Sequence, residues 1–207
     1  MRNEVTNLRV INSQFSMCRL ESNFLNKILV LFVVMVLWIS ATNINEAYAK
    51  SPASQEYQVK AGFLFNFAKF IEWPADAFKD ANNFLIIGII GRDPFGDALD
   101  VLEQKSIADR KILIRRFASV EDLQRCHILF ISNSEKENLP NIFKAIRKWH
   151  ILTVGEMKGF PQSGGMINFI LVDNKIQFEI NVDAAQRANL RISSQLLKLA
   201  RIVKEKT

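Results

Sequence analysis

The sequence has few of the residues that build disulfide frameworks, metal centres or low-complexity segments. Its 207 residues include two cysteines, two histidines, eight glycines and five prolines. Two cysteines can form neither a disulfide framework nor a four-cysteine zinc site. The low glycine and proline content excludes a collagen-like or linker-dominated chain. The net charge is +6 without a dense run of lysine and arginine, so we expect one globular domain that does not bind nucleic acid.

Motifs of the common nucleotide-binding and hydrolytic enzymes are also missing. The sequence contains no Gly-x-Ser-x-Gly, no P-loop and no Gly-x-Gly-x-x-Gly. Cys126 and His127 are neighbours, but at the start of a strand their side chains would point to opposite faces and cannot form a dyad. Asp97, Asp100 and Glu103 fall on one exposed helix face and lack the pattern of a calcium loop. We therefore expect no catalytic residues, no metal and no cofactor.

One long hydrophobic run is present, near the N-terminus. Residues 28–40 carry no charge, and four basic residues precede them. The run is shorter than the roughly 20 apolar residues that a membrane-spanning helix needs. A small-x-small site ending at Ala49 follows, and together these features predict a signal peptide over residues 1–49, cleaved after Ala49. A retained membrane anchor is the alternative. The mature chain, residues 50–207, would be a single domain in an oxidising compartment, with Cys126 as its one cysteine.

Helical and strand patterns alternate along the mature chain. A helix is expected over residues 57–73, ended by Pro74. An alternating pattern around residues 173–174 predicts a β-hairpin of residues 166–172 and 175–181. Apolar runs predict further strands, and the segments between and after the strands predict shorter helices. The expected strands are 84–90, 111–117, 128–131 and 151–154, and the expected helices are 95–104, 119–122, 134–148, 183–188 and 193–203.

This order of elements is typical of an α/β domain. We expect a three-layer sandwich in which a mostly parallel central sheet has helices on both faces. The C-terminal hairpin would add antiparallel strands at one edge of the sheet.

The helix expected over residues 57–73 carries more aromatic surface than one core stripe needs. Its core stripe recurs at helical spacing from Phe63 to Ile71. The other face includes Phe65, and exposed apolar area of this kind usually marks an association site. The alternative is that the C-terminal helix covers this face. The candidate partner-binding residues are Phe65, Lys69, Glu72 and Trp73.

Two loops are expected at the carboxyl ends of strands, where ligands bind in open α/β sheets. Residues 91–96 follow the first strand, and residues 132–134 follow the third. Both loops lead into helix N-termini, which favour anions, so an anionic or zwitterionic small molecule is the expected ligand class. The alternative is that these loops only turn the chain. The candidate ligand-binding residues are Gly91, Asp93, Phe95, Ser132 and Ser134.

Five segments of the mature chain, taken in order, resemble the YfiR-like family of periplasmic proteins. They are residues 56–74 (EYQVKAGFLFNFAKFIEWP), 93–96 (DPFG), 126–132 (CHILFIS), 164–169 (GGMINF) and 191–197 (RISSQLL). The resemblance covers nearly all of the mature chain.

The resemblance implies a non-enzymatic periplasmic repressor with an α/β sandwich fold. Its implied partner is the periplasmic part of an inner-membrane diguanylate cyclase, whose repression would lower cyclic-di-GMP and biofilm formation. An outer-membrane-linked protein would sequester the repressor, and a homodimer is also implied. Some family members carry structural disulfides, which this mature chain cannot form with Cys126 alone. The alternative is a periplasmic protein that binds or senses a small molecule.

Overall fold

The chain divides into two units, Met1–Ala49 and Lys50–Thr207. The computed structural model describes residues 31–32, 35, 52–79 and 83–204. In the first unit the described residues are helical, and the rest of the expected signal peptide lies outside the described residues. Within the described ranges, no helix combines the length and apolar character of a membrane-spanning segment. The division falls where the signal peptide is expected to end, and cleavage there stays a prediction.

An eight-stranded sheet forms the centre of the second unit, in the order β10-β8-β7-β6-β5-β2-β4-β3. Five neighbouring strands from β7 to β4 are parallel, β3 and β8 are antiparallel to their inner neighbours, and β10 is parallel to β8. The strands are β2 (Phe84–Ile90), β3 (Ser106–Ile107), β4 (Arg110–Phe117), β5 (Ile128–Ile131), β6 (Leu152–Gly155), β7 (Ile167–Val172), β8 (Lys175–Ile180) and β10 (Arg201–Ile202).

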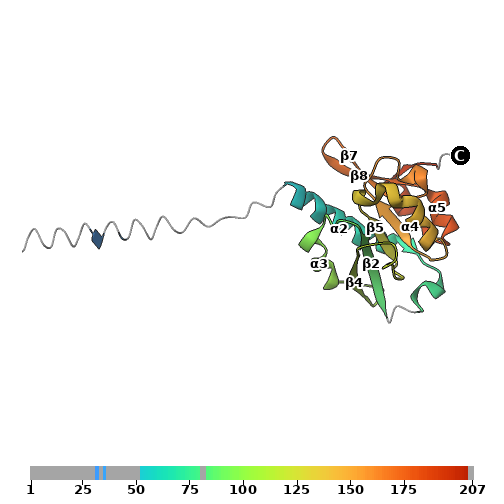
Figure 1. Cartoon of the computed structure of the whole chain (residues 1–207), viewed down its shortest axis with the longest axis horizontal. Helices are drawn as coiled ribbons and strands as arrows, with labels where there is room; N and C mark the ends of the chain where they lie inside the picture. Colours follow the sequence, from blue (N-terminus) through green and yellow to red (C-terminus); the bar gives the residue numbers. More distant parts are fainter. Residues whose placement is uncertain (1–30, 33–34, 36–51, 80–82, 205–207) are drawn as a thin grey trace, which may run out of the picture. The chain divides into compact units, whose positions relative to one another are not determined.

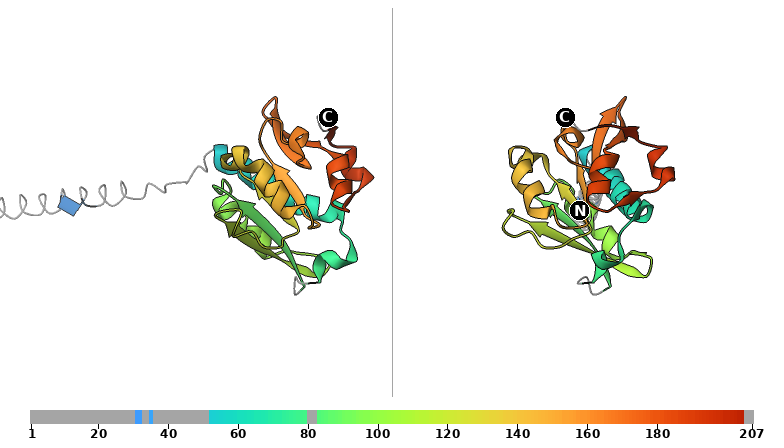
Figure 2. Two further views of the ribbon diagram at one scale, coloured as in Figure 1. Left: turned by 45° about the vertical axis from the view of Figure 1, so that its right-hand side comes forward. Right: turned by 90° about the vertical axis from the view of Figure 1, so that its right-hand side faces the viewer.

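Helices cover both faces of this sheet, as Figures 1 and 2 show for α2 and α4. The buried strand β2 has a continuous apolar sequence because its alternate side chains enter two different cores. Ile87 and Ile89 join the core under α2, whereas Ile86 and Ile90 join the core under α4. The expected three-layer α/β fold with a mostly parallel sheet is confirmed. The helices are α2 (Pro52–Phe70), α3 (Asp100–Glu103), α4 (Leu139–Ile146), α5 (Val182–Arg187) and α6 (Ser194–Leu197).

Helix α2 packs onto the hairpin of β7 and β8 through a cluster of phenylalanine rings. The Phe67 ring centre lies 5.7 Å from that of Phe169 and 5.1 Å from that of Phe178. Such aromatic pairs add to the free energy gained by burying their area. The expected hairpin is confirmed, and it lies at one end of the sheet with β10 as the outermost strand.

The first helix ends earlier than expected. Residues Ile71–Glu72 form β1, which pairs antiparallel with β9 (Arg191–Ile192). Ser193 N also donates a hydrogen bond of 2.9 Å to Phe70 O. Backbone hydrogen bonds to a distant segment therefore replace the last expected turn of the helix.

Other helices are also shorter than expected. The segment 95–104 forms the 3₁₀ helix η2 (Gly96–Ala98) and then α3. The segment 134–148 forms η3 (Asn133–Asn138) before α4, whose first turn contains Pro140, a residue suited to a helix start. Residues 119–122 form bends and turns, so the helix expected there was wrong.

The prediction of a helix over residues 193–203 was wrong for the second half of this segment. The helix α6 ends at Leu197, and Arg201–Ile202 form β10 beside β8. Val203 N donates a hydrogen bond of 2.9 Å to Ile180 O, which holds this strand on the sheet. The remaining short helices are η1 (Ala75–Phe78) and η4 (Pro161–Ser163).

Candidate interaction site

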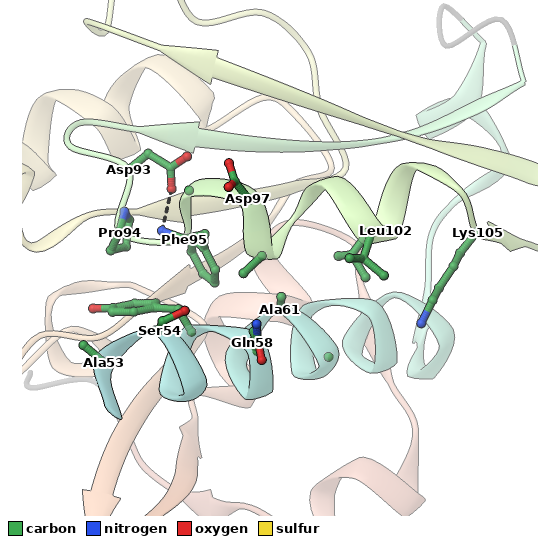
Figure 3. Close-up of a pocket in the computed structure, with 15 residues that line it drawn as sticks. Ala53, Ser54, Gln58, Ala61, Asp93, Pro94, Phe95, Asp97, Leu102 and Lys105 are labelled. Atoms are coloured by element: carbon green, nitrogen blue, oxygen red, sulfur yellow. Dashed lines mark hydrogen bonds between the residues drawn. The ribbon is translucent and has the colours of Figure 1, made fainter. Parts of the chain in front are cut away.

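A groove of about 920 Å³ runs between α2 and the segment that follows β2 (Figure 3). Residues 53–62 supply one wall, and residues 93–105 supply the other. We call this hollow the α2 groove. Several lining residues have short side chains, including Ala61 and Gly62 of α2 and Ala98 on the opposite wall. These short side chains leave open space between the two walls.

The α2 groove has open space next to one wall and exposed apolar surface on the other. A Cβ atom placed on Gly62 would have no heavy atom within 4 Å apart from its chain neighbours and the backbone of its own helix. Val101, on the opposite wall, keeps 58% of its surface exposed. Surface of this kind is available to an apolar group of another molecule.

Phe65 and Lys69 lie beyond the central part of the groove, near Lys105. Phe65 is partly buried and packs against the core, so it is less exposed than the sequence pattern indicated. The Lys69 and Lys105 ammonium groups lie 4.3 and 4.9 Å from the centre of its ring. Among the described residues, no carboxylate lies within salt-bridge distance of either ammonium group. Two cations therefore share one aromatic ring.

Glu72 and Trp73, the other two candidate partner-binding residues, lie at a different place. Both line a hollow of about 470 Å³ together with Arg191 and neighbouring residues of the α5–β9 segment. Trp73 is partly buried, and its ring centre lies 6.1 Å from that of Phe78. The structure thus separates the four candidate residues: Phe65 and Lys69 lie next to Lys105 of the α2 groove, whereas Glu72 and Trp73 line a different hollow.

The two loops considered for ligand binding lie side by side. Arg92 N donates a hydrogen bond of 3.0 Å to Ser134 Oγ. Ser132 caps η3, and its Oγ accepts a hydrogen bond from Ser134 N. Gly91 has φ +85°, and a Cβ atom there would meet Ser134 and Glu135. These hydroxyl groups are engaged in holding the loops together.

Asp93 and Phe95 also have structural partners. Asp93 Oδ1 accepts a hydrogen bond of 2.7 Å from Phe95 N, and Oδ2 accepts one of 2.7 Å from Arg116 Nε. The hydrogen bond that Arg116 donates to Asp93 raises the pKa of Arg116. Phe95 is 5% exposed and contacts the rings of Tyr57 and Phe130 edge-on. Both residues therefore shape one wall of the α2 groove, and binding of an anion there stays a prediction.

A buried charged network holds α2 against the sheet, and sequence reasoning missed it. Lys60 is 6% exposed, and its ammonium group lies 2.7 Å from Glu156 Oε2 and also contacts Glu56. Tyr57 Oη donates a hydrogen bond of 2.8 Å to Glu156 Oε1. Burial, together with these carboxylates, raises the pKa of Tyr57. Lys60 itself was the available signal. It lies four residues before Leu64, so a charged side chain was to be expected on the core face of the helix, where it needs a partner.

Cys126 and His127 lie in different surroundings. Cys126 is buried in the core under α4, where burial raises the pKa of its thiol to about 12. His127 stacks on Phe78 at 4.3 Å, and its Nδ1 accepts a hydrogen bond of 2.9 Å from Ile86 N. Burial lowers the pKa of His127 to about 4. At neutral pH the thiol is therefore protonated and the imidazole uncharged.

Within the described ranges, no group of three or more His, Cys, Asp and Glu side chains is placed to hold a metal ion.

The fold and the α2 groove define a three-layer α/β domain with a surface suited to binding another molecule. The chain belongs to the YfiR/HmsC-like family, which matches residues 57–201. The family resemblance seen in the sequence is confirmed. Membership fits a periplasmic regulatory role rather than a catalytic one.

Several solved structures match part of the chain, including the following two. One is an ABC domain in complex with L-Trp from Streptococcus pneumonia, with 12% identity, 62% of this chain and 58% of that chain covered, and a TM-score of 0.42. The other is a conserved domain protein from Vibrio cholerae, with 12% identity, 75% and 60% covered, and a TM-score of 0.44. This chain therefore spans less than two thirds of the length of either protein.

Proposed function

We propose that this protein is a non-enzymatic periplasmic regulator that binds and represses an inner-membrane diguanylate cyclase. Its activity would lower cyclic-di-GMP and so reduce biofilm formation. The observation that carries this proposal is the family match over residues 57–201. The α2 groove supports it because a regulator that acts by binding needs an accessible surface with apolar character.

The same proposal covers the export of the repressor and its release from the cyclase. The chain would be exported and cleaved after Ala49. In the periplasm it would be released from the cyclase when an outer-membrane-linked protein sequesters it, and two copies would form a homodimer. Ala49→Arg would block processing, because signal peptidase accepts only small residues at this position. Material from the periplasm that starts at Met1 would contradict export by cleavage.

The central experiment deletes the gene and measures intracellular cyclic-di-GMP. We expect a rise that the wild-type gene reverses, and we expect the purified mature protein to bind the periplasmic domain of the affected cyclase. Unchanged cyclic-di-GMP after deletion would overturn the proposal.

A second function, small-molecule binding, is favoured by a cleft of about 510 Å³ between α4 and α5. Its lining includes Phe143, Trp149 and Met166, with Arg147 and Arg187 among the polar groups. Its size and mainly apolar lining are typical of small-molecule sites. A thermal-shift screen of small organic acids tests this alternative. Melting temperatures that do not change with any acid, while the cyclase still binds, would favour the repressor function.

A further inference from the structure

We propose that the α2 groove receives an amphipathic helix of the partner, and that an acidic side chain of this helix lies between Lys69 and Lys105. The identity of the partner as a diguanylate cyclase rests on the proposed function. The chemistry of the bound segment follows from the groove itself.

The length and lining of the groove fit a helix. On α2 the lining runs from Ala53 to Gly62, which is about 14 Å, or roughly two and a half turns of a helix lying beside it. Lys69 lies about two turns further along α2, so a longer bound helix would reach it. Ala61, Gly62 and Ala98 are small, and small side chains allow the backbones of packed helices to approach closely. Helices commonly bind other proteins by placing an apolar face in a groove of this kind.

Apolar contacts are available where such a helix would lie. The space above Gly62 is open to at least 4 Å from a Cβ position, and Val101 on the opposite wall is 58% exposed. A side chain of the bound helix that enters this space would cover Val101. This burial would supply the hydrophobic part of the binding free energy.

The charge at one end of the groove is positive. Lys69 and Lys105 lie within 4.9 Å of the centre of the Phe65 ring, so at most about 9 Å separates their ammonium groups. Among the described residues, no carboxylate neutralises either lysine, although like charges at this distance repel. A carboxylate placed near these ammonium groups would offset this repulsion and gain a charge-assisted hydrogen bond.

The acidic residues of the groove do not offset this charge. In Figure 3, Lys105 points toward α2, whereas Asp97 points away from it. Asp93 is paired with Arg116 at 2.7 Å. The charge that faces the open groove is therefore positive, which favours an acidic segment over a basic or neutral one.

The first test places a photo-crosslinking phenylalanine derivative at Gly62 in cells that contain the cyclase. The matched control carries it at Ala145, an exposed helical position on α4. We expect a crosslink from position 62 to a segment of the cyclase that has apolar residues at helical spacing and a net negative charge. A crosslink to a second copy of this chain, to a basic or extended segment, or at no higher yield than from position 145 would overturn the inference.

The second test measures binding of the purified cyclase periplasmic domain. Lys105→Glu should weaken binding at least tenfold, and replacing the crosslinked acidic residue by lysine in the partner should restore it. The matched control Lys144→Glu makes the same charge change on α4. Gly62→Leu should block binding with an unchanged or raised melting temperature, because leucine favours a helix more than glycine does. Ala145→Leu is its control. Wild-type affinity in Lys105→Glu and Gly62→Leu would contradict the inference.

The outcomes separate the two proposals. If deletion raises cyclic-di-GMP but the groove variants bind and repress as the wild type does, the groove inference fails and the proposed function stands. If deletion leaves cyclic-di-GMP unchanged, the proposed function fails. The groove inference then stands only if position 62 crosslinks to an acidic helix of another protein and Lys105→Glu abolishes that crosslink.

Discussion

Lys60 Nζ lies 2.7 Å from Glu156 Oε2, and the side chains of both residues are largely buried, with 7% and 13% of their surface exposed. The contact joins α2 to the residue that follows β6, 96 positions along the chain. Tyr57 donates a hydrogen bond to the other oxygen of the same carboxylate. Because Tyr57 also lines the α2 groove, this network fixes the wall of the candidate interaction site.

Removing Lys60 should be strongly destabilising. Lys60→Met leaves the Glu156 carboxylate buried without its cation, and removal of one partner from a buried ion pair costs about 3–5 kcal/mol. Urea unfolding measures the loss. The double variant Lys60→Met/Glu156→Gln should recover part of it, since the buried charge is then gone. A single variant within about 1 kcal/mol of the wild type would show that the pair is not a structural anchor.

The buried imidazole of His127 should make stability depend on pH. Its pKa is about 4 in the folded protein, below the ordinary value of 6.5, because burial disfavours the charged form. The unfolded chain therefore binds a proton at His127 at a higher pH than the folded chain does. The stabilisation is complete above pH 6.5 and is lost as the pH falls toward 4, by roughly 3 kcal/mol in total.

Denaturant unfolding at pH 7 and pH 4.5 tests this dependence. His127→Asn is the informative variant, since an amide oxygen can accept the hydrogen bond from Ile86 N without titrating. His150→Asn is the control, because His150 is only partly buried. Equal loss of stability in the wild type and His127→Asn would contradict this role of His127.

Cys126 should be inert in the folded protein. The thiol is buried and its pKa is raised to about 12, so almost no thiolate is present at neutral pH. We expect no reaction with a thiol reagent in buffer, complete reaction in denaturant, and a melting temperature that does not change with dithiothreitol. Rapid labelling of the native protein, or a covalent dimer on a non-reducing gel, would contradict this prediction.

The sequence predicts those helices and strands whose hydrophobic pattern can be recognised within the segment itself. Strands such as β2 could be recognised because a strand buried on both faces requires a continuous apolar run. The sequence does not predict β1 and β10, which are two residues long and exist only because β9 and β8 lie beside them. Propensity carries no information about such pairings, since distant segments supply the hydrogen bonds.

In the candidate interaction site, too, the sequence predicts what lies within one segment and misses the contacts between distant segments. Phe65 and Lys69 could be placed on one helix face from their spacing. The sequence could not place Lys105 beside them, because β2 and α3 separate it from α2 along the chain. Only the folded structure brings Lys105 to the Phe65 ring. Glu72 was expected on the same face and Trp73 in the same interaction site, but the helix ends at Phe70 and both residues line another hollow.

Phe65→Ala should weaken both stability and partner binding. The ring is partly buried against the core, so its removal should cost roughly 1–3 kcal/mol, less than truncation of a fully buried phenylalanine. It also removes the surface that positions Lys69 and Lys105, so binding of the cyclase domain should weaken by about 2 kcal/mol. Phe65→Leu is the matched variant, because it keeps most of the apolar contact but lacks the aromatic ring. We expect near-normal stability and reduced binding for Phe65→Leu, measured by thermal unfolding and titration calorimetry. If Phe65→Ala loses 3–5 kcal/mol of stability while its folded fraction binds as the wild type does, Phe65 belongs to the core alone.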